Sequence, residues 1–138
     1  MKELKFKAIH QNWSLMGMGD WNNTEWNIYN DLSVKIKVKY NPFDIEGFND
    51  TVDAEMKISI DEYNEILKQI NLAKNDNSFV DGCDGDAWEF IQYNDNCEIW
   101  KRELGYIYGI KPLEKVGKIL EKMIGFRYNF KSSHFFNI

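Results

Sequence analysis

The sequence predicts a single α+β domain over residues 1–138, with an antiparallel sheet of about five or six strands and two amphipathic helices packed on one face. Three observations lead to this prediction. Several segments alternate apolar and polar residues, which is the two-residue period of a strand. Two further segments place apolar residues three and four positions apart, as an amphipathic helix does. One strand segment has lysine at every second position, which is typical of an antiparallel sheet with one solvated face.

The strands before the first predicted helix are recognised by alternation. The clearest of them has three lysines and ends at Asn41-Pro42, whereas residues 12–20 are either a further strand or a packed loop. Asn30-Asp31 marks a turn, because Asn and Asp tolerate left-handed backbone angles. The last two strands are expected to form a hairpin. The alternating segments are 4–8, 26–29, 34–40 and 52–60.

The apolar period changes near Ile60, where a helix over residues 60–73 is expected. Ser59 and Glu62 have the spacing of a capping box, in which each side chain hydrogen-bonds the backbone N–H of the other. Ile58 and Tyr63 are placed to form the hydrophobic staple that accompanies such a box. These features predict where the helix begins.

A hairpin and a second helix follow a polar loop at residues 75–86. The strand 87–93 turns at residues 94–96 and returns to about Leu104. The second helix begins near Pro112 and ends at Gly125, which is placed as a C-terminal cap. Its expected buried residues are Leu113, Val116, Leu120, Met123 and Ile124.

An aromatic C-terminal tail is expected over residues 126–138, and it contains the pair Phe135-Phe136. Chain termini usually fray. An aromatic pair there therefore has three possible placements: on its own domain, in a homo-oligomer contact, or exposed.

Composition indicates a cytoplasmic globular protein. Apolar residues make up 43% of the 138 residues, and no apolar run reaches the roughly 18 residues that a membrane helix needs. The N-terminal residues lack the apolar core of a signal peptide. The thiols of Cys83 and Cys97 are expected to be reduced, because the hairpin register places Cys97 opposite about Gln92 or Tyr93, far from Cys83.

The net charge of −5 is unevenly distributed along the chain. Residues 61–95 carry two basic and nine acidic groups, whereas residues 96–138 carry eight basic and four acidic groups. An acidic protein gains little from phosphate contacts, so nucleic-acid binding is not expected. The acidic segment is either a solvated loop or a surface for a basic partner. Its candidate contact residues are Asp76, Asp81, Asp84, Asp86 and Glu89.

Sequence patterns for metal, cofactor or catalytic sites are not met. An EF-hand loop counted from Asp81 has Cys83 at position 3 and Gln92 at position 12, where calcium needs oxygen ligands and a glutamate. The two cysteines, His10 and His134 lack zinc-ligand spacing, and both histidines are expected to be exposed. Acidic neighbours disfavour a reactive thiolate at Cys83, and Cys97 is expected to pack in a strand. No catalytic residue, metal or cofactor is predicted.

A second candidate surface combines tryptophan and methionine in a loop-like segment. Most of the five tryptophans are expected in the core. The exception is a cluster that is suited to a partner, because methionine adapts to irregular surfaces and tryptophan is common at interface centres. Its residues are Trp13, Met16, Met18 and Trp21.

Residues Asp84-Gly85-x-x-Trp88-Glu89, the later segment 105–109 and Leu113-Glu114 resemble small uncharacterised bacterial proteins. Some of those proteins are similar to immunity proteins encoded beside polymorphic toxins. In order of elements the resemblance covers residues 25–124. It implies a protein that blocks a toxin by occupying its surface, and it brings no catalytic residue.

These observations favour a non-catalytic protein-binding module. A first alternative is a ligand-binding or enzymatic domain with an aromatic-walled pocket between the sheet and the helices. A second alternative is a homo-oligomeric structural protein that uses its aromatic tail.

Overall fold

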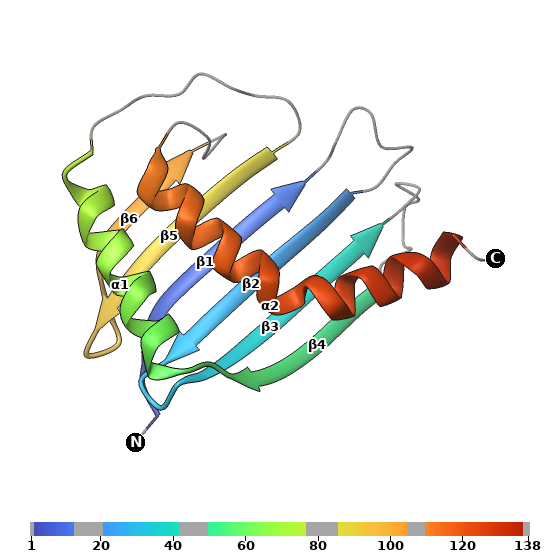
Figure 1. The fold of residues 1–138 in the computed structure, drawn as a ribbon, viewed down its shortest axis with the longest axis horizontal. Helices are drawn as coiled ribbons and strands as arrows, with labels where there is room; N and C mark the ends of the chain where they lie inside the picture. The colour runs from blue at the N-terminus through green and yellow to red at the C-terminus, as the bar shows by residue number, and fades with distance from the viewer. Residues whose placement is uncertain (1, 13–20, 42–49, 77–85, 105–109, 137–138) are drawn as a thin grey trace.

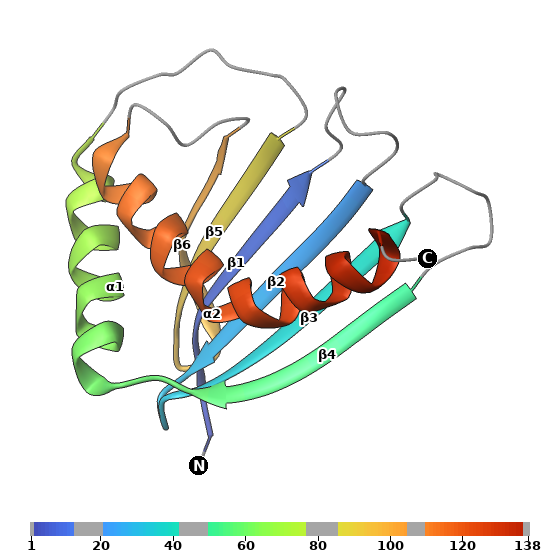
Figure 2. The same cartoon turned by 45° about the vertical axis from the view of Figure 1, so that its right-hand side comes forward.

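A computed structural model of the chain describes residues 2–12, 21–41, 50–76, 86–104 and 110–136. The fold is α+β, as predicted: a six-stranded antiparallel sheet with two helices on one face (Figures 1 and 2). The strands lie in the order β4-β3-β2-β1-β5-β6. They are β1 (Leu4–Asn12), β2 (Trp21–Tyr29), β3 (Ser33–Asn41), β4 (Asp50–Lys57), β5 (Asp86–Asn94) and β6 (Cys97–Leu104), and the helices are α1 (Ile60–Lys74) and α2 (Lys111–Phe136).

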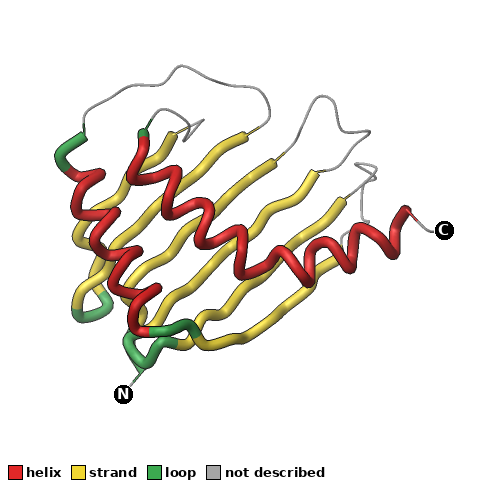
Figure 3. Tube along the Cα trace, viewed as in Figure 1, coloured by secondary structure: helices red, strands yellow, loops and turns green. Residues whose placement is uncertain are grey.

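The first four strands form a meander, and α1 then leads the chain back to the other side of β1. Consequently β1 lies between β2 and β5, although it is the first strand in the sequence. The tube in Figure 3 shows both helices crossing the same face of the sheet. The predicted hairpin of β3 and β4 is confirmed, although β4 ends at Lys57 and the chain is already helical at Ile60.

The buried face of the sheet is formed by residues with even numbers, and the register aligns them across the strands. One row runs Ala54, Ile36, Trp26, Ala8 and Phe90, from β4 to β5. Trp26, Ala8 and Phe90 are 0% exposed. The helices complete this core with buried side chains, namely Ile66, Ile70 and Ala73 from α1 and Leu113, Val116 and Leu120 from α2.

Aromatic rings from three strands stack at the centre of the core. Trp88 in β5 stacks on Trp26 with ring centroids 5.8 Å apart and on Phe90 with centroids 5.5 Å apart. Phe6 in β1 continues the stack to Phe90 at 6.1 Å. Ala8 lies between Trp26 and Phe90 in the register, and its small side chain leaves room for the rings of β2 and β5 above β1.

One buried hydrogen bond joins this aromatic stack to α2. The indole Nε1–H of Trp26 donates to the main-chain carbonyl of Leu120 at 3.0 Å. A buried indole N–H needs a partner, because an unpaired polar group in a core costs free energy. The bond therefore fixes how α2 lies along the sheet.

Helix α1 begins as the sequence predicts. The Ser59 hydroxyl accepts from the Glu62 N–H at 3.1 Å, and the Glu62 carboxylate accepts from the Ser59 N–H at 3.4 Å. At its other end, Arg102 of β6 donates through Nη1 to the carbonyls of Ala73 at 3.2 Å and Asp76 at 2.8 Å. A guanidinium at the carbonyl end of a helix also matches the helix dipole.

The sequence prediction for the end of α2 is wrong. The helix does not stop at Gly125 but continues to Phe136, so most of the predicted tail 126–138 is helical backbone. Figures 1 and 2 show that α2 changes direction partway along its length. Glycine at a mid-helix position costs only about 1 kcal/mol relative to alanine, which a long helix tolerates.

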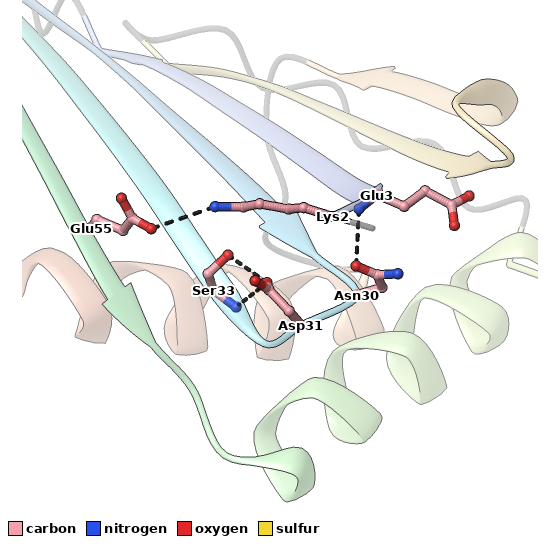
Figure 4. Close-up of polar contacts among 6 residues, drawn as sticks. All are labelled: Lys2, Glu3, Asn30, Asp31, Ser33 and Glu55. Atoms are coloured by element: carbon pink, nitrogen blue, oxygen red, sulfur yellow. Dashed lines mark hydrogen bonds and ion pairs between the residues drawn. The ribbon is translucent and has the colours of Figure 1, made fainter.

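The β2–β3 turn, at one end of the sheet, also contacts the residue that precedes β1 (Figure 4). Asp31 accepts hydrogen bonds from the Ser33 hydroxyl at 2.6 Å and from the Ser33 N–H at 3.0 Å, and these bonds lower the pKa of Asp31. Asn30 accepts from the Glu3 N–H at 2.9 Å through its side-chain oxygen. Leu32 takes the positive φ of 70° that closes this turn.

Replacement of Trp26 by phenylalanine tests the link between the stack and α2. The ring remains apolar, but the hydrogen bond to Leu120 and part of the buried volume are lost, so we expect Trp26→Phe to lower the free energy of unfolding by at least about 1–2 kcal/mol. Urea unfolding followed by circular dichroism measures this loss. Trp100→Phe, at a half-buried position beside the core, is the control. Equal losses in the two variants would contradict a special role for the Trp26 bond.

Asp31→Asn tests the β2–β3 turn through the pH dependence of stability. A carboxyl whose pKa is lowered on folding stabilises the folded state at pH values above its ordinary pKa of 3.8, and this contribution is lost as the pH falls below that value. We therefore expect Asp31→Asn to be less stable than the wild type at neutral pH, with a difference that shrinks in acid. Unfolding midpoints measured from neutral pH to below pH 3.8 give the difference in stability between the variant and the wild type. The exposed Glu98→Gln is the control, and a constant difference for Asp31→Asn would argue against the prediction.

Candidate functional site

The open face is the face of the sheet turned away from α1 and α2 (Figure 2). It is formed by the odd-numbered residues of the strands. Lys35, Lys37 and Lys39 are exposed on it, which confirms the prediction of a solvated lysine face. The opposite face carries the core, whereas neither helix covers the open face.

Charges on the β2–β3–β4 part of the open face alternate in sign across the strands. Lys37 lies between Glu25 and Asp53, and Lys35 lies opposite Glu55. Opposite charges in direct cross-strand positions stabilise a sheet. An open hollow of about 470 Å³ lies among these side chains. The pattern there is explained by the needs of the sheet itself.

The β5–β6 part of the open face has a different pattern. Glu89 and Glu103 lie directly opposite each other, and like charges in that position are unfavourable. Lys101 reduces the repulsion, since its Nζ lies 3.2 Å from the Glu89 carboxylate and 3.1 Å from the Glu103 carboxylate. Its hydrogen bonds with Glu103 and Glu89 raise the pKa of Lys101. Two carboxylates and one ammonium leave this group with one net negative charge.

An open hollow of about 410 Å³ lies beside these carboxylates. Ile9 and Ala87 give it an apolar floor, Gln11 contributes an amide, and Glu89 and Glu103 are its acidic groups. Trp88 and Leu104 also line it, although they belong to the buried face. We call this the acidic hollow. It combines an apolar floor with unbalanced negative charge.

Ile91 is an apolar residue of the open face beside the acidic hollow that its neighbours cover. It lies on the open face between Lys7 and Lys101 in the register, yet it is only 6% exposed. Lysine side chains cover apolar neighbours with their aliphatic stems while the ammonium groups stay in water. We attribute the burial of Ile91 to its two lysine neighbours.

Of the five residues of the predicted acidic surface, the structure describes the side chains of Asp76 and Glu89. Glu89 lies at the acidic hollow, whereas Asp76 follows α1 on the helix side, where its carbonyl accepts from Arg102. Asp86 begins β5, and its side chain is outside the described part. Asp81 and Asp84 lie outside the described residues.

The predicted tryptophan–methionine surface also falls largely beyond the described residues. Trp13, Met16 and Met18 lie there, and Trp21 begins β2 with a side chain that is not described. The expectation that most tryptophans pack in the core is confirmed for Trp26 and Trp88, which are 0% and 2% exposed.

Two predictions about single residues are wrong. Cys97 does not pack but is exposed with a free thiol, because it is the first residue after the hairpin turn in the edge strand β6. It lies opposite Asn94. His10 is half-buried rather than exposed, and it stacks on Trp88 with ring centroids 4.1 Å apart, because the even positions of β1 face the helices.

Within the described ranges, His, Cys, Asp and Glu side chains do not gather in a group of three or more that could hold a metal ion. Among the helices described, none is long and apolar enough to cross a membrane. Comparison with protein-family models found no matching family. Comparison with curated protein sequences found no matching protein.

Glu103 and Lys101 are site residues that sequence reasoning missed. Both occur in an ordinary alternating strand, and only the hairpin register shows that Glu103 lies opposite Glu89. The local signal is the two-residue turn Asp95-Asn96, in which both residues have positive φ. Turns of this kind fix the hairpin register.

The contacts of Lys101 with Glu89 and Glu103 predict a measurable coupling free energy between Lys101 and Glu103. Lys101→Met should lower stability by leaving Glu89 and Glu103 to repel each other, and Glu103→Gln in the same chain should restore part of the loss. A double-mutant cycle by urea unfolding measures this coupling. Lys37→Met, between Glu25 and Asp53, is the matched control. Additive effects of Lys101→Met and Glu103→Gln would show that the coupling is absent.

Proposed function

We propose that this chain is a protein-binding module and that the open face of its sheet is the contact surface. The proposal rests on the difference between the two faces of the sheet. One face holds the core and both helices, whereas the other presents charged side chains over an apolar floor with two hollows. Interfaces commonly combine an apolar centre with a polar rim.

The charge of the acidic hollow favours a basic partner. Cross-strand pairing accounts for the charges around Lys37, but the pair of Glu89 and Glu103 opposes sheet stability. Unfavourable like charges that are kept on a surface are available to a partner of opposite sign. A basic protein surface placed against the open face would relieve this repulsion.

We further propose that the partner is a toxin encoded beside this chain and that binding blocks the surface of the toxin. The support is the resemblance of residues 84–114 to immunity-like proteins. The acidic hollow suits that role, because electrostatic attraction speeds association with a basic target.

Two charge-reversed proteins test the contact surface. The first carries Glu55→Lys and Glu103→Lys, one at each hollow of the open face. The second carries Asp61→Lys at the start of α1 and Glu98→Lys near the hairpin turn, and has the same net charge as the first. Calorimetric titration with purified products of the neighbouring genes measures the Kd of each.

The open-face protein is expected to bind at least about tenfold more weakly than the wild type, a difference of about 1.4 kcal/mol, whereas the control binds like the wild type. If a bound product arrests growth, co-expression of the wild-type chain should relieve the arrest and the open-face protein should not. Failure of every neighbouring product to bind would contradict the proposal, and so would equal losses in the two charge-reversed proteins.

A further inference from the structure

We propose that the acidic hollow receives an arginine side chain of the partner protein and that Lys101 occupies its carboxylates until that arginine arrives. The inference rests on the proposed function and names the group that would be recognised. Three features support it: the Glu89–Glu103 pair, the exposure of Lys101 and the lining of the hollow.

The carboxylates already show which chemistry they bind. Glu89 and Glu103 each place an oxygen close to one ammonium group, at 3.2 and 3.1 Å. That ammonium neutralises only one of the two charges. The pair therefore has capacity for further N–H donors, whether they join Lys101 or replace it.

Lys101 is held only weakly. Its side chain is 39% exposed, and the side chain of Glu103 is 66% exposed. Ion pairs with this much exposure contribute little to stability, because water screens the charges and both side chains lose freedom. Displacement of Lys101 by a stronger ligand therefore costs little, and its ammonium can swing into solvent.

The lining of the hollow suits the rest of an arginine side chain. Ile9 and Ala87 provide an apolar floor for the three-carbon stem, and the methyl side chain of Ala87 leaves the space open. The Gln11 amide lies on the same lining. An apolar floor that ends at paired carboxylates fits a long side chain with a cationic end.

Arginine is preferred over lysine because of the geometry of the two carboxylates. Its planar guanidinium has five N–H donors in a fixed fork and loses less hydration on binding than an ammonium does. Because Glu89 and Glu103 lie opposite each other on neighbouring strands, one guanidinium can hydrogen-bond both. Lysine offers only the point charge that Lys101 already supplies.

Peptide titrations followed by amide NMR spectra test the inference. The probes are capped tripeptides of glycine, a central residue and glycine, in which the centre is arginine, lysine or citrulline, the neutral counterpart of arginine. The proteins are the wild type, Lys101→Met, Lys101→Gln and Ala87→Leu. Each spectrum also shows whether the variant is folded.

The arginine peptide is expected to shift the amides of Glu89 and Glu103 in the wild type and to bind Lys101→Met and Lys101→Gln at least about threefold more tightly. Ala87→Leu fills the hollow and should remove these shifts, and citrulline should give none. Unchanged or weaker binding of arginine after removal of Lys101 would overturn the inference, as would lysine shifts equal to those of arginine.

The result of the peptide titrations can be distinguished from the result of the partner titrations that test the proposed function. If a neighbouring gene product binds the open face but arginine does not respond to removal of Lys101, only this inference fails. If arginine binds as expected but the charge-reversed open face binds the partner normally, the proposed contact surface fails, and with it the partner as the source of the arginine, although the hollow itself still binds arginine.

Discussion

The hydrogen bond from the Trp26 indole to the Leu120 carbonyl sets where α2 lies on the sheet, within the apolar core that holds the two layers together. It joins the middle of the sheet to the middle of α2, and it lies where aromatic rings from β1, β2 and β5 stack. The apolar rings favour burial without specifying a position, whereas the indole N–H needs one partner in one place. The core therefore has both stability and a defined register between its layers.

Because all of the core lies on one side, the other side of the sheet is free for charge. On β2, β3 and β4 the charges alternate and support pairing, as around Lys37. On β5 and β6, Glu89 and Glu103 repel each other, and Lys101 neutralises only one of the two negative charges. A sheet selected for stability alone has no need of that arrangement, which is why this region supports a binding proposal.

The fold could be predicted from sequence because its signals are local. Lysine at every second position fixed the faces of β3, and the capping box of Ser59 and Glu62 marked the start of α1. Gly125 did not predict the end of α2, because a glycine that favours a helix cap is also tolerated inside a helix that continues.

The candidate site was predicted only through Glu89. A three-residue turn at 94–96 would have placed Lys101 opposite Glu89, whereas the two-residue turn and the register shift after Gln92 place Glu103 there. This difference in register replaces the favourable pair of Lys101 and Glu89 with the unfavourable pair of Glu103 and Glu89. Side-chain chemistry is read from the sequence, but the neighbour across a strand is set by backbone geometry.

The central position of β1 has a consequence for synthesis on the ribosome. Phe6 pairs with Gln92, so one side of the first strand has no partner until most of the chain has emerged. At about 5–20 residues per second, that delay lasts several seconds. Lys5 and Lys7 in β1 place charge beside this temporarily unpaired edge, and charge of this kind discourages nascent chains from associating through their strands.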